Sequence, residues 1–145
     1  MRIIGLDVGD KTIGVAMSDE LGITAIPMTV ISRTGSLKRE IGEIRRMVEE
    51  NGVECIVVGM PFMLDGSMGI QAGKVEAFVE ELRRRLRVQI VTWDERLTTS
   101  EVERILIASD QSRMKRKKVI DKMAAAVMLR SYMESRKFKG ESDEL

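Results

Sequence analysis

Three acidic residues stand where carboxylates could do chemistry: Asp7, Glu95 and Asp121. Asp7 interrupts the apolar run 2–8, Glu95 follows the apolar run 88–93 after Asp94, and Asp121 has small and apolar neighbours. A buried carboxylate without a partner is costly, and a divalent cation is one way to compensate for it. Hard oxygen donors without histidine suit Mg²⁺ or Mn²⁺ and suit zinc poorly. Such a cluster can hold two ions ~3.5–4 Å apart and hydrolyse phosphodiesters.

Each acid taken alone also has a plainer interpretation. Asp7 could accept hydrogen bonds from the turn at Gly9, and Glu95 could pair with Arg96 or favour a helix N-terminus. Asp121 could stabilise the first turn of its own helix. What favours a shared site is position, because ligands of an open α/β sheet bind beyond the carboxyl ends of its parallel strands. Asp94 is a further candidate for the same cluster.

The composition excludes several other classes of site. The chain has no histidine and only one cysteine, Cys55, which rules out histidine-based triads, disulfides and Cys-rich metal centres. With 24 basic and 23 acidic side chains, any nucleic acid must be bound by a local basic patch. No run approaches the ~20 apolar residues of a membrane span. We therefore expect a cytoplasmic protein without a membrane partner.

A basic stretch next to Asp121 is the strongest candidate for phosphate binding. Five of the six residues 113–118 are cations, namely Arg113, Lys115, Arg116, Lys117 and Lys118. Such a run is usually a solvated face, but a polyanion needs cations where its backbone enters a carboxylate-lined site. Lys11 and Arg96 are further candidates for nucleic-acid contacts. Because aromatic residues make up only 3%, recognition should follow backbone and shape rather than base stacking.

The loop that follows the apolar run 53–58 is the expected substrate loop. Its glycines allow close approach of a ligand to the backbone. The candidate residues are Gly59, Pro61, Asp65, Gly66 and Ser67. Neither this loop nor the turn 9–12 is a Walker loop, so no nucleotide cofactor is predicted.

The spacing of apolar residues predicts the element order β-β-β-α-β-α-β-α-α. Strands are expected at 2–8, 12–18, 23–32, 53–58 and 88–93, and helices at 37–51, 75–86, from 98 onward, and at 118–132. Pro27 places the third strand at an edge or bulge. The inner face of the last helix is expected to hold Ile120, Met123, Ala124 and Val127.

These elements predict an α/β fold with a mixed five-stranded sheet. Short turns join the first three strands into an antiparallel meander, and strand–helix–strand units add parallel strands with helices on both faces. This is the order of ribonuclease H-like folds. Residues 1–138 should form a single domain, and 139–145, which are polar and without periodicity, a flexible tail.

Segments along nearly the whole chain resemble the YqgF/RuvX family. They are Gly5 to Gly9, Ile13 to Ala16 with Ser18-Asp19, the loop 59–67, Asp94 to Thr99, and Lys117 to Ala125. These small ribonuclease H-like proteins are described as Holliday junction resolvases and as pre-16S rRNA nucleases. The resemblance implies a cytoplasmic, Mg²⁺- or Mn²⁺-dependent nuclease that matures the 16S rRNA 5′ end, with Asp7, Glu95 and Asp121 as its acids. Many members have a polar residue where this chain has Met63, so no substrate hydrogen bond is expected from that side chain.

Three functions are compatible with these residues. The first is a metal-dependent endonuclease acting on structured RNA, in particular precursor 16S rRNA. The second has the same chemistry but resolves four-way DNA, which requires two active sites and hence a dimer. The third is a non-catalytic nucleic-acid-binding assembly factor. No apolar helix face is evidently reserved for dimerisation, so we expect a monomer or a weak homodimer.

Overall fold

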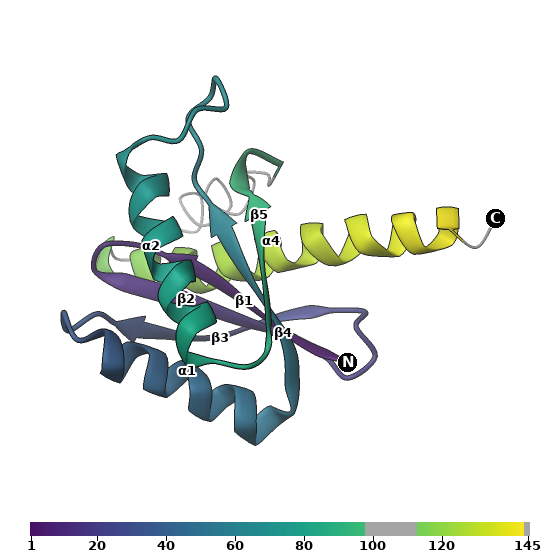
Figure 1. Cartoon of the computed structure of the whole chain (residues 1–145), viewed down its shortest axis with the longest axis horizontal. Helices are drawn as coiled ribbons and strands as arrows, with labels where there is room; N and C mark the ends of the chain where they lie inside the picture. The colour runs from purple at the N-terminus through teal and green to yellow at the C-terminus, as the bar shows by residue number, and fades with distance from the viewer. Residues whose placement is uncertain (98–112, 144–145) are drawn as a thin grey trace.

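The five strands form one mixed sheet (Figure 1). The computed structural model describes the backbone of residues 1–97 and 113–143 and the side chains of 1–97 and 121–136. The strands are β1 (Arg2–Val8), β2 (Thr12–Ser18), β3 (Ala25–Ser32), β4 (Val53–Met60) and β5 (Gln89–Asp94), in the order β3-β2-β1-β4-β5. The β1–β2 and β2–β3 pairs are antiparallel, and the β1–β4 and β4–β5 pairs are parallel. The predicted sheet is confirmed.

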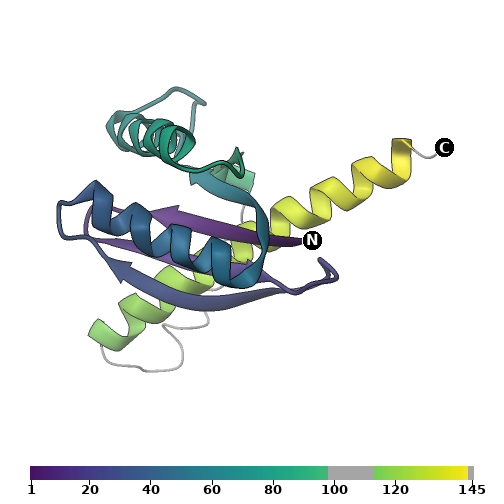
Figure 2. The same ribbon diagram turned by 60° about the horizontal axis from the view of Figure 1, so that its bottom comes forward.

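Helices cover both faces of this sheet (Figure 2). α1 (Leu37–Asn51) and α2 (Ile70–Arg85) pack on one face, α4 (Arg113–Asp143) packs on the other, and a short 3-10 helix, η1 (Glu95–Leu97), follows β5. α1 begins and ends as predicted, because the Ser36 side chain accepts a hydrogen bond from the Arg39 amide and Gly52 ends the helix in a left-handed conformation. No helix in the described ranges has the length and apolar character needed to cross a bilayer.

Alternation along the strands assigns each side chain to one of the two faces. On β1, Ile4, Leu6 and Val8 belong to the core under α1 and α2, whereas Ile3 belongs to the core under α4. Asp7 shares its face with Ile3 and therefore points to the α4 side. This is how one acid comes to lie at the end of a strand made otherwise of buried aliphatic residues.

Several element boundaries differ from the sequence-based expectation. β4 ends at Met60 rather than 58, so Gly59 belongs to the strand and not to the predicted substrate loop, and β5 spans Gln89–Asp94 rather than 88–93. β3 begins at Ala25 rather than 23, but it is the edge strand, and its register shifts next to Pro27, as predicted. α2 begins at Ile70 rather than 75. α4 begins at Arg113 and runs to Asp143, because arginine and lysine are strong helix formers. The expected tail therefore overlaps this helix, and the helix expected from residue 98 lies outside the described residues.

The predicted inner face of α4 is wrong. Among the α4 side chains that the structure describes, Met123, Ala124 and Val127 are only partly buried, and Ile120 lies outside this range. The buried ones are Ala125, Ala126, Met128, Leu129 and Met133. Residues 123–129 are all apolar, so the apolar pattern could not decide which stripe faces the sheet. The stripe actually used continues backward through position 121, which puts Asp121 on the sheet-facing side.

Candidate active site

Asp7 and Glu95 meet across β4 at the carboxyl ends of the parallel strands. Asp7 is near the end of β1, and Glu95 opens η1 directly after β5. β4 lies between these strands, and a Cβ added at Gly59 would come within 2.5 Å of Oε1 of Glu95. Because Gly59 has no side chain, Glu95 can reach over β4 and hydrogen-bond the side chain of Asp7.

The two carboxyl groups are partly buried, and a charge on either one raises the cost of a charge on the other. Burial is the main cause that raises the pKa of Asp7, and the charge of Asp121 adds to it. Burial, followed by the charge of Asp7 and its hydrogen bond, raises the pKa of Glu95 to about 8. The hydrogen bond between the two side chains opposes the rise in the pKa of Asp7 and adds to the rise in the pKa of Glu95, so Glu95 is the member of the pair that holds its proton more tightly.

Asp121 is brought to the same edge by the close approach of α4 to the sheet. The Thr12 hydroxyl donates a hydrogen bond of 2.8 Å to Oδ2 of Asp121. A Cβ at Gly14 would overlap the backbone carbonyl of Asp121, and one at Gly5 would lie 2.9 Å from Cβ of Leu129. Two glycines on the sheet thus allow the helix backbone to rest on it. Gly14 is the cross-strand partner of Asp7, so the helix carries Asp121 toward Asp7.

The predicted acids are therefore brought together in part. Asp7 contacts Glu95, and Asp121 is near enough for its charge to act on Asp7. No three Asp, Glu or Cys side chains in the described part of the chain form a metal site as they stand. None of the ion pairs between described side chains includes any of the three acids. Carboxylate oxygens that repel one another, with no cation paired to them among the described side chains, fit a hard divalent ion.

Asp94 turns away from this cluster and pairs with Arg96. Nε of Arg96 lies 3.0 Å from both carboxylate oxygens of Asp94, and Nη2 lies 2.6 Å from Oδ2. The pairing of Glu95 with Arg96 that the sequence allowed is thus replaced by one with Asp94, whose pKa it lowers. The Arg96 guanidinium also lies 5.8 Å from the centre of the Phe62 ring, so it joins η1 to the loop after β4.

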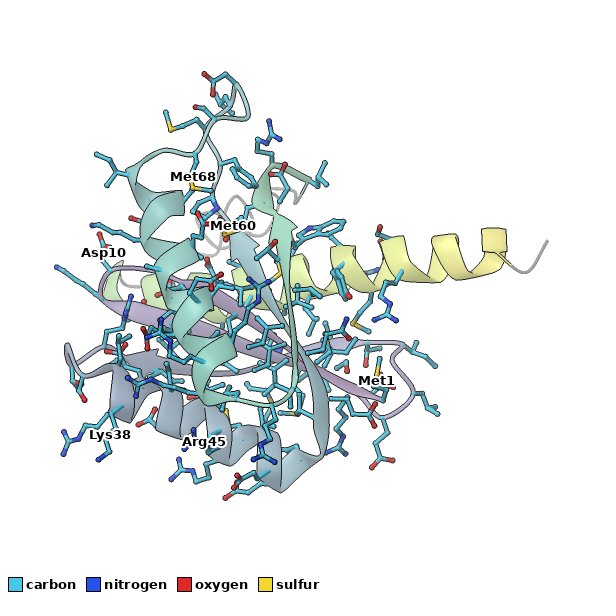
Figure 3. All side chains as sticks on the ribbon, viewed as in Figure 1. Met1, Asp10, Lys38, Arg45, Met60 and Met68 are labelled. Atoms are coloured by element: carbon cyan, nitrogen blue, oxygen red, sulfur yellow. The ribbon has the colours of Figure 1, made fainter. Side chains whose placement is uncertain are left out.

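The predicted substrate loop is a structured turn at the same end of the molecule (Figure 3). The amides of Met63 and Gly66 donate to the carbonyls of Ser67 and Met63, at 2.9 and 2.8 Å. Asp65 accepts from both the amide and the hydroxyl of Ser67, at 2.9 and 2.6 Å. Asp65 and Ser67 therefore shape the turn itself, with Gly66 at φ 89°. Leu64 is left 95% exposed at its tip.

The basic candidates are only partly described. Lys11 is exposed in the β1–β2 turn, which directly follows the end of β1 that carries Asp7. The cations of residues 113–118 belong to the first turns of α4, but their side chains lie outside the described residues.

The sequence-based reasoning missed the roles of Thr12 and Gly14, and it placed Gly59 in the substrate loop rather than under the Glu95 side chain. The period of two along 12–18 could have placed both on one face of the strand. Their partner, Asp121, is 109 residues away from Thr12 in the chain, and only the folded chain reveals it.

Comparison with known proteins agrees with the resemblance read from the motifs. A family model described as RuvX, Holliday junction resolvase, matches residues 1–135. A protein of Desulforamulus reducens is 52% identical over 135 residues, which cover 93% of this chain and 98% of the relative. One of Desulforudis audaxviator is 47% identical over 137 residues, covering 94% and 96%. Both are named "Putative pre-16S rRNA nuclease".

The fold comparison gives the same answer at a greater distance. RuvC of T. thermophilus in complex with a Holliday junction substrate superposes with a TM-score of 0.53 and 17% identity, over 94% of this chain and 95% of that chain. This likeness confirms the ribonuclease H-like fold. The predicted enzyme class, a hydrolase that acts on nucleic acids, agrees with the family description and with the relatives' names. Because the family model spans residues 1–135 and both relatives align over nearly their whole length, the chain belongs to the RuvX family.

Proposed function

We propose that this protein is a cytoplasmic, metal-dependent endonuclease that hydrolyses phosphodiester bonds during 5′-end processing of pre-16S rRNA. The contact between Asp7 and Glu95 carries this proposal, because two partly buried carboxyl groups face each other with no cationic partner among the described side chains. Structures maintain such repulsion at functional sites more often than elsewhere. The names of the relatives favour precursor rRNA as the substrate.

Asp7, Glu95 and Asp121 would hold Mg²⁺ or Mn²⁺. When bound, such an ion supplies an activated water and stabilises the leaving oxygen of the cleaved phosphodiester. The chain's own residues bind and orient the substrate. Lys11 and the cations of residues 113–118 would neutralise the RNA backbone on its way to the acids. The turn 63–67 stands at the same end, where its backbone can meet a nucleic-acid strand.

The test is cleavage of a precursor 16S rRNA 5′ fragment by Asp7→Asn. This variant keeps the shape of the side chain but weakens it as a ligand, so we expect cleavage to fall roughly a hundredfold or more. Asp10→Asn is the matched control, because Asp10 is an exposed acid that pairs with Lys74 at 3.3 Å. Undiminished cleavage by Asp7→Asn, or by the wild type in EDTA, would overturn the proposal.

A four-way DNA junction is the second candidate substrate. The family description names a Holliday junction resolvase, and the fold resembles RuvC bound to a junction. Symmetric cleavage of a junction needs two active sites, whereas a monomer or weak homodimer suffices for RNA. Cleavage of matched RNA and junction substrates in one assay decides between the two. The mass of each protein–substrate complex then shows whether the protein binds it as a monomer or as a dimer. Tight RNA binding without divalent-ion binding would instead indicate a non-catalytic assembly factor.

A further inference from the structure

We propose that Thr12 is a positioning residue that fixes the Asp121 carboxylate for the metal site. The inference rests on the proposed function. Its basis is the hydrogen bond of 2.8 Å from the Thr12 hydroxyl to Oδ2 of Asp121, in a partly buried setting. This bond connects the first residue of β2 to the third turn of α4.

β2 holds Asp121 at two points. The backbone carbonyl of Asp121 lies over Gly14, where no Cβ would fit. The Asp121 carboxylate accepts a hydrogen bond from Thr12, which precedes Gly14 by two residues on the same face of β2. Since Gly14 pairs directly with Asp7 across the antiparallel β1–β2 ladder, this arrangement also sets how near Asp121 comes to Asp7. The strand therefore fixes both the backbone and the carboxylate of the third acid.

The turn that carries Thr12 is itself held by backbone hydrogen bonds. The Thr12 carbonyl accepts from the Gly9 amide at 2.8 Å, and the Lys11 carbonyl accepts from the Arg33 amide at 2.9 Å. The Arg33 guanidinium also donates to the Gly9 carbonyl at 3.0 Å. The Thr12 backbone is thus fixed without its hydroxyl, and a β-branched side chain has few rotamers to choose from. The hydroxyl is left free to orient Asp121.

The chemical effect of this bond is to orient one carboxylate. Thr12 occupies Oδ2 of Asp121, and within the described part of the chain Oδ1 accepts no hydrogen bond. A carboxylate held in this way offers one oxygen in a set direction to a cation. Groups that orient metal ligands by hydrogen bonds typically contribute about 10- to 100-fold to metal affinity.

The experiment compares Thr12→Val with Thr12→Ser. Valine keeps the shape of threonine and removes the hydroxyl, whereas serine keeps the hydroxyl. We expect calorimetry on the RNA-free protein to show Mn²⁺ binding weakened about 10- to 100-fold in Thr12→Val and restored to within about threefold of wild type in Thr12→Ser. Cleavage by Thr12→Val should need more Mn²⁺, with the KM for RNA unchanged. Thr29→Val, which removes an exposed hydroxyl from β3, is the control.

The outcomes separate this inference from the function on which it rests. If the wild type binds no divalent ion, the proposed function fails. If the wild type binds Mn²⁺ and Thr12→Val binds it equally well, the role of Thr12 is overturned while the function stands. Equal weakening in Thr12→Ser would also overturn the role, because packing and not the hydroxyl would then matter. Should Thr12→Val fail to fold, Thr12→Ala removes the same hydroxyl and is compared with Thr12→Ser instead.

Discussion

The two faces of the sheet are packed in different ways. Under α1 and α2 the strands present large aliphatic residues, among them Ile4, Leu6 and Ile56, all fully buried. Under α4 they present the small residues Gly5, Gly14 and Ala16, and α4 packs the small residue Ala125 on this face. Side-chain volume is thus small where α4 must come near the strand ends. The face under α1 and α2 contributes most of the buried apolar surface. The face under α4 allows the helix backbone to come close to the sheet.

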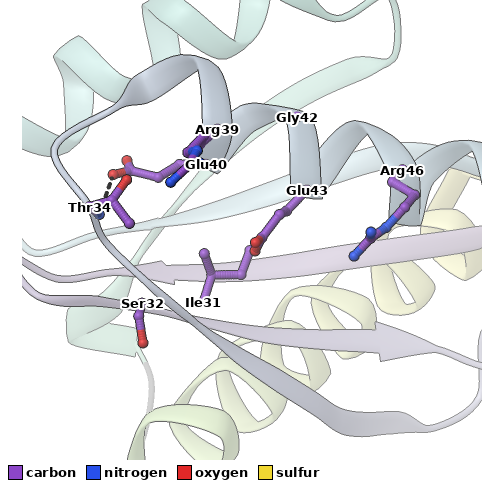
Figure 4. Close-up of a pocket in the computed structure, with 8 residues that line it drawn as sticks. All are labelled: Ile31, Ser32, Thr34, Arg39, Glu40, Gly42, Glu43 and Arg46. Atoms are coloured by element: carbon purple, nitrogen blue, oxygen red, sulfur yellow. Dashed lines mark hydrogen bonds between the residues drawn. The ribbon is translucent and has the colours of Figure 1, made fainter.

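The acids on the two faces also differ: Glu40 is buried, whereas Asp7 and Glu95 are partly buried. Glu40 on α1 is only 2% exposed, yet it accepts a hydrogen bond from Nε of Arg33 at 3.1 Å. It also accepts one from the amide of Thr34 at 3.2 Å, which Figure 4 shows. Arg33 lies 5.2 Å from the centre of the Phe78 ring, which fixes it further. Asp7 and Glu95 have no such cation among the described residues. A carboxylate neutralised in this way contributes to the fold, whereas the repulsion between Asp7 and Glu95 is the feature on which the proposed metal site rests.

The largest expected effect is on Glu40. Glu40→Ala leaves the partly buried Arg33 without its partner and opens a cavity at a buried position, so it should cost about 3 kcal/mol of unfolding free energy. Urea denaturation measures it, with Glu43→Ala as the control because Glu43 is exposed on the same helix. A loss no larger than that of the control would mean that the two faces do not differ in how they treat charge.

Next in size is the effect of filling the space under α4. Gly14→Ala puts a Cβ into the backbone carbonyl of Asp121, so α4 must shift. We expect a loss of roughly 1–3 kcal/mol together with reduced cleavage, since Asp121 moves with the helix. Gly42→Ala is the matched control: nothing lies within 4 Å of its added Cβ, and alanine favours α1. Equal stability of both variants would show that the close approach at Gly14 is not required.

The ends of the strands and the acids could be predicted because their signals are local. A turn at Gly9-Asp10 stops the first apolar run, and a charge inside such a run is visible at once. The inner face of α4 and the role of Gly59 could not be predicted. The first depends on which of seven consecutive apolar residues meets the glycines of the sheet, and the second on a side chain arriving from another strand. Asp94 and Glu95 are adjacent acids, and only the turn of η1 directs one outward and the other inward.

A smaller effect is expected from Glu95, and it depends on pH. Its pKa in the folded protein is about 8, against an ordinary value of 4.5. Between these values the folded state holds a proton that the unfolded state has lost, so stability falls as the pH rises from about 4.5 to 8. In EDTA, Glu95→Gln should therefore gain at least about 1 kcal/mol of stability over the wild type at pH 8.5, and be no more stable than the wild type near pH 4.

Thermal or urea unfolding at a series of pH values measures this difference. Saturating Mn²⁺ should stabilise the wild type more than Glu95→Gln, because the ion relieves a repulsion that the amide lacks. Glu43→Gln, an exposed change, should follow the wild-type curve. Parallel curves for Glu95→Gln and the wild type in EDTA would contradict this prediction. They would show that the pKa of Glu95 is not raised by folding and that Glu95 is charged in the metal-free protein.

The smallest effect on stability is expected from Arg96→Gln. The Arg96 side chain is 38% exposed in its pair with Asp94, whereas Arg33 is 22% exposed and its partner Glu40 only 2%. Water hydrates both groups of the outer pair when it is broken, so such pairs contribute little to stability. The urea midpoint should stay within the error of the measurement, while Glu40→Ala shifts it strongly. A large shift in Arg96→Gln would mean that Arg96 holds the turn 63–67 against η1 as firmly as Arg33 holds the β1–β2 turn. The Arg96–Asp94 pair beside the acids would then stabilise the fold as much as the Arg33–Glu40 pair under α1 does.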